Sequence, residues 1–134
     1  MRYLGLDLGT KTLGISISDK TGIIATSLTT IRHDDDFNYL TKELKKIIEE
    51  REVDVLLVDP PRSGMDDKML DAIAQALPKK IIYISCNPST LAKNLKVLKH
   101  NYHVTTILPY DLFPHTPHIE SITVLERDNY KNDK

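Results

Sequence analysis

The chain has 134 residues and a formal net charge of -1, with 18 Lys and Arg against 19 Asp and Glu. This length favours one compact domain, and the balanced charge argues against a basic arm that binds nucleic acid. The single cysteine excludes an internal disulfide framework and a cysteine-rich zinc or iron–sulfur site. Because no apolar run approaches the roughly 20 residues of a membrane span and no signal-peptide pattern opens the chain, we predict a soluble cytoplasmic domain with no membrane partner.

The first part of the chain has the pattern of strands joined by hairpin turns. Apolar residues alternate with small or polar ones over residues 3–8 and again over 13–18, which is the period of a strand with one buried face. A third β-rich segment runs from Ile23 to Ile31. The period then becomes helical from Phe37, after the acidic run Asp34 to Asp36. We interpret this run as a helix N-cap rather than a metal site, because carboxylates favour helix starts.

From residue 53 onward, strands and helices alternate. Val53 to Val58 is almost wholly apolar, as expected for a parallel strand covered on both faces. We therefore expect Leu57→Ala to cost about 2–5 kcal/mol of stability. Asn87 and Pro88 have the residue types of an N-cap and a first helical position. The other expected elements are a helix after Gly64, a strand over 80–85, and late strands over 103–108 and 120–125.

The opening segment MRYLGLDLGTKTLG carries a D-x-G-x-K-x-x-G pattern from Asp7 to Gly14. With the hairpins and helix that follow it, this segment resembles the RNase H-fold Holliday-junction-resolvase-like family, whose members act as pre-16S ribosomal RNA nucleases. The resemblance covers residues 1–58. It implies that Asp7 is a catalytic metal ligand for Mg²⁺, although the family's later carboxylates have no counterpart in this chain.

The second half contains motifs of a different family. The motifs are Asp59-Pro60-Pro61-Arg62, then Ser85-Cys86-Asn87-Pro88-Ser89-Thr90, then Asp111-Leu112-Phe113-Pro114-His115-Thr116 with His118-Ile119-Glu120. In this order they resemble the closing segment of S-adenosylmethionine-dependent RNA 5-methyluridine methyltransferases, of the 23S rRNA uracil-5-methyltransferase type, over residues 53–127. The resemblance implies that Cys86 adds to carbon 6 of a uracil, that Glu120 removes the proton from carbon 5, and that Asp59 contacts the cofactor.

The two resemblances meet at the apolar strand 53–58. We interpret the chain as a hybrid, natural or engineered, that forms one α/β domain over residues 1–127 with a polar tail at 128–134. The resemblances imply a mixed sheet of order 3-2-1-4-5-7-6 in three layers, with helices on both faces. In such a sheet Asp7, Asp59, Cys86 and Glu120 should meet at one rim, because ligands bind at the carboxyl ends of parallel strands.

The functional prediction from sequence is a hybrid that lacks a complete active site. Gly9-Thr10-Lys11-Thr12 stands where the methyltransferases have a glycine-rich cofactor loop, so we expect no cofactor to bind tightly and RNA to bind weakly. One alternative is a residual RNA uracil-5-methyltransferase that uses Cys86, Glu120 and S-adenosylmethionine. A second alternative is a Mg²⁺-dependent nuclease built on Asp7. His115 and His118 have a spacing seen in zinc sites, but we interpret them as residues that shape their loop.

Overall fold

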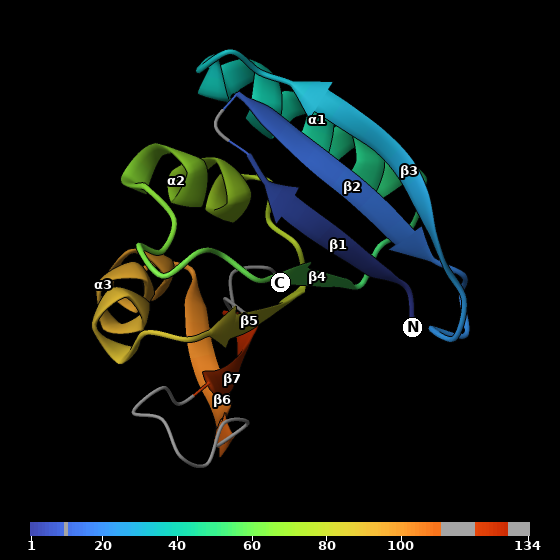
Figure 1. Ribbon diagram of the computed structural model, residues 1–134. Coiled ribbons are helices and arrows are strands. Elements are labelled where there is room, and N and C mark those ends of the chain that lie inside the picture. Colours follow the sequence, from blue (N-terminus) through green and yellow to red (C-terminus); the bar gives the residue numbers. More distant parts are fainter. Residues whose placement is uncertain (10, 111–119, 129–134) are drawn as a thin grey trace.

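The computed structural model describes residues 1–9, 11–110 and 120–128 of the chain (Figure 1). No helix within these residues is long and apolar enough to cross a membrane. In chain order the elements are β1 (Tyr3–Leu8), β2 (Thr12–Ser18), β3 (Ala25–Arg32), α1 (Phe37–Glu50), β4 (Val55–Val58), α2 (Asp67–Gln75), β5 (Lys80–Ser85), α3 (Pro88–Leu98), β6 (Tyr102–Tyr110) and β7 (Glu120–Arg127).

The strands form one seven-stranded sheet in the order β3-β2-β1-β4-β5-β7-β6, which confirms the predicted order. The first three strands pair antiparallel as hairpins, and β4 joins β1 and β5 in parallel. β7 then runs antiparallel to both β5 and β6. The sheet is therefore parallel at its centre and antiparallel on both sides.

A side chain caps the N-terminus of each of the three helices, and the sequence predicted two of these caps. The Asp36 carboxylate accepts a hydrogen bond from the Tyr39 amide at 3.0 Å. Asn87 accepts one from the Ser89 amide at 3.0 Å, with Pro88 as the first residue of α3. At the start of α2, Asp66 accepts from the Met69 amide at 2.8 Å. Each cap satisfies an amide that has no partner inside its helix.

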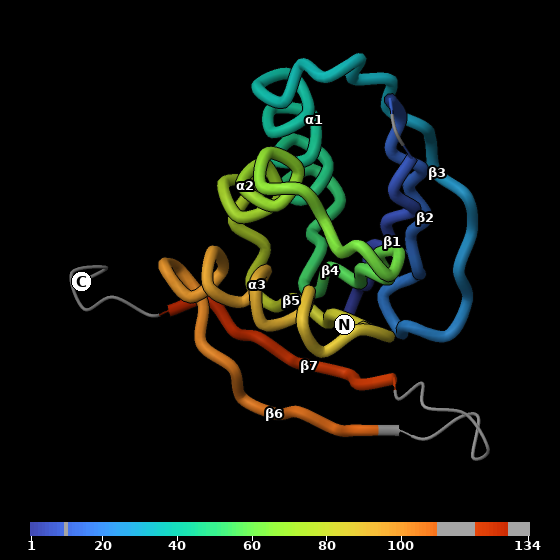
Figure 2. The backbone as a smooth tube through the Cα atoms, turned by 60° about the vertical axis from the view of Figure 1, so that its left-hand side comes forward, coloured from blue at the N-terminus to red at the C-terminus, as the bar shows by residue number. Residues whose placement is uncertain are grey.

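All three helices pack on the same face of the sheet, so the prediction of helices on both faces was wrong (Figure 2). The chain moves in one direction across the sheet from β3 to β4, β5 and β6, and right-handed crossovers in one direction place their helices on one side. A second helical layer would need crossovers between β1, β2 and β3. Those strands are joined by hairpins, so the described part of the chain has two layers.

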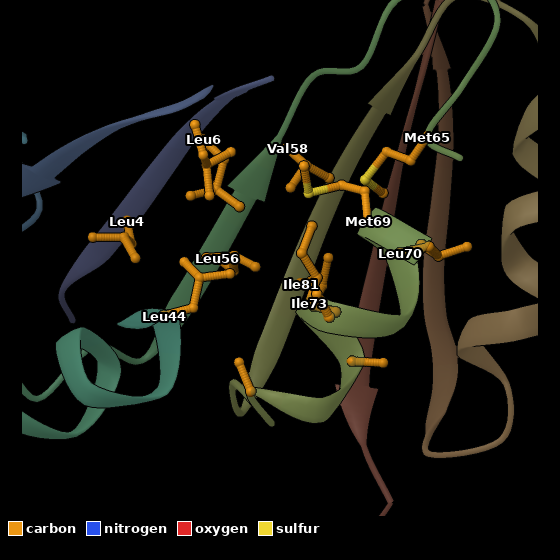
Figure 3. Close-up of a cluster of buried hydrophobic side chains, with 14 of the residues drawn as sticks. Leu4, Leu6, Leu44, Leu56, Val58, Met65, Met69, Leu70, Ile73 and Ile81 are labelled. Carbon is orange, nitrogen blue, oxygen red and sulfur yellow. The ribbon is translucent and has the colours of Figure 1, made fainter. Parts of the chain in front are cut away.

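The hydrophobic core lies between the sheet and these helices (Figure 3). Leu4, Leu56 and Ile81 lie side by side on β1, β4 and β5, and each is at most 1% exposed. Leu44 of α1 and Ile73 of α2, both fully buried, cover them from the helical layer.

Adjacent leucines of β4 have different environments, because successive strand residues point to opposite faces. Leu56 belongs to the core and is fully buried, whereas Leu57 points to the helix-free face and is half-buried. The loss of stability that we expected for Leu57→Ala is therefore expected for Leu56→Ala instead.

Candidate active site

Asp7 and Asp59 lie at the carboxyl ends of two neighbouring parallel strands. Asp7 is the fifth residue of β1, and Asp59 follows directly after the last residue of β4. Leu6 pairs with Val58, so the next residue on each strand brings the two aspartates to the same rim of the sheet. Both side chains are exposed.

Cys86 and Glu120 form a second pair at this rim. Ser85 of β5 is opposite Ser121 of β7 in the antiparallel register. Cys86 is the next residue of the first strand and Glu120 is the preceding residue of the second, so the register places them beside each other. Both are half-buried. The structure therefore places all four predicted site residues along one rim: Asp7 on β1, Asp59 directly after β4, Cys86 directly after β5 and Glu120 at the start of β7.

The loop that begins at Asp59 is held against the start of α3. The Asn87 side-chain amide donates to the Arg62 carbonyl oxygen at 3.0 Å, and the Thr90 hydroxyl donates to the same oxygen at 3.0 Å. The side chain of Asn87 thus links the two motifs while it also caps α3. This contact fixes the Asp59 loop next to the helix that follows Cys86.

Asn94 holds the end of the same loop, and sequence reasoning missed it. Its side chain is 1% exposed; Oδ1 accepts from the Met65 amide at 3.1 Å and from the Tyr83 hydroxyl, and Nδ2 donates to the Met65 carbonyl oxygen at 3.0 Å. Gly64 has a φ of 76°, and a Cβ there would lie 3.0 Å from Asn94 Oδ1. The sequence could have indicated this role, because Asn94 lies between Leu91 and Leu98 on the apolar side of α3. An amide buried on such a side needs hydrogen-bond partners from other segments.

The Tyr83 hydroxyl provides a pH-dependent test of this packing. Burial raises the pKa of Tyr83 to about 12, and the charge of nearby Cys86 adds to the shift. An unfolded tyrosine ionises near about pH 10. The contribution of the neutral Tyr83 hydroxyl to the free energy of unfolding is therefore fully present below about pH 10. It is lost as the pH rises toward about 12.

We expect the free energy of unfolding to fall over this window and to fall less steeply in Tyr83→Phe. Burial also raises the pKa of Tyr102, which accounts for the slope that remains in the variant. Urea titrations between about pH 9 and about pH 12 measure the difference. If the free energy of unfolding fell equally steeply with pH in the two proteins, the contribution assigned to Tyr83 would be contradicted.

The residues after β1 do not fit the cofactor geometry that the methyltransferase resemblance implies. That geometry needs a helix N-terminus after the first strand. Here the Gly9 amide donates to the Thr12 carbonyl oxygen at 3.0 Å, and the chain turns directly into β2. A Cβ at Gly9 would lie 2.8 Å from Thr12 Oγ1, so this glycine serves the tight turn.

A cavity of about 350 Å³ lies between this turn and the loop before α2. Its lining residues are Leu8, Gly9, Pro61, Ser63, Gly64, Met65, Asp66 and Met69. Its carboxylate, Asp66, is already the N-cap of α2. The residues that line the cavity are therefore mostly apolar, and its carboxylate already has a structural role as a helix cap.

The proposed metal ligands do not come together in the described residues. No group of three or more His, Cys, Asp or Glu side chains within residues 1–9, 11–110 and 120–128 could hold a metal ion. Asp7 as a metal ligand stays a prediction. His115 and His118 lie outside the residues that the structure describes.

The mixed sheet of this order, with its three helices, defines a single α/β domain. A family model described as tRNA (Uracil-5-)-methyltransferase matches residues 25–128. The chain therefore belongs to this family. The match begins in β3, well before the boundary at residue 53 that the sequence motifs indicated.

Relatives with known sequences and structures agree with this assignment. A protein of Bacillus cereus described as an uncharacterized RNA methyltransferase is 49% identical over 74 residues, and one of Listeria monocytogenes is 52% identical over 73 residues. The crystal structure of Pyrococcus abyssi tRNA (uracil-54, C5)-methyltransferase in complex with S-adenosyl-L-homocysteine superposes with a TM-score of 0.50 at 30% identity. That alignment covers 66% of this chain and 26% of the Pyrococcus chain.

The chain spans about a sixth of the length of these curated relatives: 16% of each, against 55% and 54% of its own length. Family membership supports the methyltransferase part of the hybrid interpretation. The nuclease part of the hybrid interpretation stays a prediction.

Proposed function

We propose that this chain forms the uracil-activating part of an RNA uracil-5-methyltransferase. The observation that carries the proposal is the register of β5 and β7, which places Cys86 next to Glu120 in a member of this family. Both residues stand at the positions that the family motifs assign to the nucleophile and the base. RNA is the substrate class that the family implies.

Cys86 and Glu120 would act at two adjacent carbon atoms of the base. The Cys86 Sγ forms a bond to carbon 6, and the electron pair of the 5,6 double bond moves toward the oxygen on carbon 4. Carbon 5 then accepts a proton from solvent. Glu120 removes the original hydrogen of carbon 5 as a proton, the double bond re-forms and the bond from Sγ to carbon 6 breaks. The net change is exchange of one hydrogen atom.

The Asp59 loop and α3 would hold this pair in place. Asn87 and Thr90 fix the loop to the helix that follows Cys86. In the family, S-adenosylmethionine supplies the methyl group. Because the turn after β1 does not fit that cofactor, we expect this chain to bind it weakly and to stop at hydrogen exchange.

Hydrogen exchange at carbon 5 tests the proposal without a methyl donor. We expect a uridine-containing RNA oligonucleotide in D₂O to gain deuterium at carbon 5, as measured by mass spectrometry. Cys86→Ala and Glu120→Gln should each lower the rate by at least about 100-fold, the usual scale for a positioned acid–base group. Glu50→Gln makes the same change as Glu120→Gln at an exposed position of α1; it is the matched control and should leave the rate unchanged.

Two results would contradict this function. One is the absence of exchange in the folded wild-type chain, and the other is exchange that persists in Cys86→Ala. A separate experiment adds S-adenosylmethionine and measures both methylation and binding of the donor. Methylation at carbon 5 with micromolar affinity for the donor would contradict the expected weak binding while it supports the roles of Cys86 and Glu120.

A further inference from the structure

Ser85 is the last residue of β5 and stands directly before Cys86. Its side chain is only 4% exposed, which is uncommon for a serine. The steps proposed for Cys86 and Glu120 do not involve this hydroxyl. A buried hydroxyl needs hydrogen-bond partners, and the partners of Ser85 indicate what it does.

The Ser85 hydroxyl closes a short turn around Cys86. Its Oγ accepts a hydrogen bond from the Asn87 amide at 3.1 Å and donates one to the Asn87 carbonyl oxygen at 3.0 Å. Both bonds span Cys86, which is the residue between the two partners. One side chain therefore joins the backbone before Cys86 to the backbone after it.

Asn87, the partner of Ser85, is itself fixed to two other segments. Its Nδ2 donates to the Arg62 carbonyl oxygen at 3.0 Å, and its Oδ1 caps α3 through the Ser89 amide at 3.0 Å. β5 leads through this turn directly into α3 (Figure 1). Because both ends of the turn are held, the backbone of Cys86 has little freedom to move.

The backbone of Ser85 also sets the position of Glu120. Ser85 is opposite Ser121 in the antiparallel register of β5 and β7, so Cys86 and Glu120 are the next opposed pair. Opposed residues of antiparallel strands have Cβ atoms about 4.5–5.5 Å apart. Ser85 thus contacts the strand of Glu120 through its backbone and the turn of Cys86 through its hydroxyl.

We propose that Ser85 is a positioning residue, whose hydroxyl holds the Cys86 thiol toward carbon 6 of a uracil while Glu120 faces carbon 5. This inference rests on the proposed function of Cys86 and Glu120. Removing the hydroxyl leaves both reacting groups in the chain but releases the turn between them. A displacement of about 1 Å at a reacting group can lower a rate by about 100-fold.

Deuterium exchange at carbon 5 of a uridine-containing RNA oligonucleotide tests this role. Ser85→Ala lowers kcat at least about tenfold. It changes KM less than about twofold, because the hydroxyl does not contact the RNA. Ser85→Thr keeps the hydroxyl and restores most of the rate.

Ser18→Ala is the matched control. Ser18 is 8% exposed, and its Oγ also accepts from a backbone amide, that of Tyr3 at 2.8 Å, and donates to a carbonyl oxygen, that of Asp19 at 2.9 Å. This serine lies at the start of β1, the end of the sheet opposite the rim. Its removal costs similar hydrogen bonds and leaves the exchange rate unchanged.

Circular dichroism confirms that each variant is folded before its rate is compared. An unchanged kcat in Ser85→Ala overturns the positioning role. A folded Ser85→Thr variant that is as slow as Ser85→Ala also overturns it, because the hydroxyl would then not matter. So does an equal loss of rate in Ser18→Ala.

A second measurement needs no RNA. In Glu120→Cys the new thiol stands opposite Cys86, at a separation that a disulfide can bridge after a small adjustment. Glutathione disulfide oxidises the two thiols to a disulfide and is reduced to glutathione. The effective concentration of the two thiols, obtained from this equilibrium, falls at least about tenfold when Ser85→Ala is added.

The two measurements separate this inference from the proposed function. Equal effective concentrations with and without the Ser85 hydroxyl overturn the positioning role. Absence of deuterium exchange in the wild-type chain contradicts the proposed function, while the thiol equilibrium still reports whether Ser85 holds Cys86 beside position 120.

Discussion

Replacing Leu56 by Ala lowers the free energy of unfolding by about 2–5 kcal/mol, the usual cost of a large-to-small change in a core. Leu56 is fully buried on the central strand β4. Leu4 and Ile81 flank it on the two neighbouring strands, and α1 covers it from the helical layer (Figure 3). These neighbours belong to three different elements, so they cannot all move in to fill the cavity.

Leu57→Ala is the matched control for this prediction. It removes the same atoms from the next residue of the same strand, but that side chain is half-buried on the helix-free face of the sheet. Less surface returns to water and no closed cavity forms, so we expect less than half of the cost of Leu56→Ala. Urea denaturation followed by circular dichroism measures both costs. Equal costs would contradict the assignment of the two faces.

Asn94→Leu destabilises the chain by about 2–5 kcal/mol, because a buried polar group without a partner costs about 1–3 kcal/mol. The change keeps the side chain at a similar size but removes both of its polar atoms. The Met65 amide, the Met65 carbonyl oxygen and the Tyr83 hydroxyl then lose their partner. These groups come from the loop before α2 and from β5, so the variant also releases the loop from the rim.

Two controls separate this network from a general effect of leucine in a helix. Asn38→Leu makes the same change at an exposed position of α1 and should be nearly neutral. Tyr83→Phe removes one hydrogen bond of the network and should cost less than Asn94→Leu. Native-state hydrogen exchange gives the local measurement: the Met65 amide should exchange faster in Asn94→Leu. Unchanged protection of this amide would contradict the role of Asn94.

The candidate site could be predicted from sequence because it depends on topology. A residue at the end of a parallel strand lies at the carboxyl rim, and an antiparallel neighbour returns its first residue to the same rim. Once β5 and β7 were expected as neighbours, the pairing of Cys86 with Glu120 followed from strand direction alone. The N-cap at Asp36 was predictable for a similar reason, because a cap is a local interaction within a few residues.

The order of the elements was thus determined by the sequence alone, whereas the order of the strands was what the two family resemblances implied. Given that order, strand direction determined which residues lie at the rim. Periodicity shows which residues share one side of a strand, but it does not show which side is covered. Only the tertiary structure decided that all three helices lie on one face, that Leu56 is in the core while Leu57 is not, and that Asn94 links Met65 to Tyr83. These features depend on contacts between segments far apart in the chain, and such contacts exist only after the layers have packed.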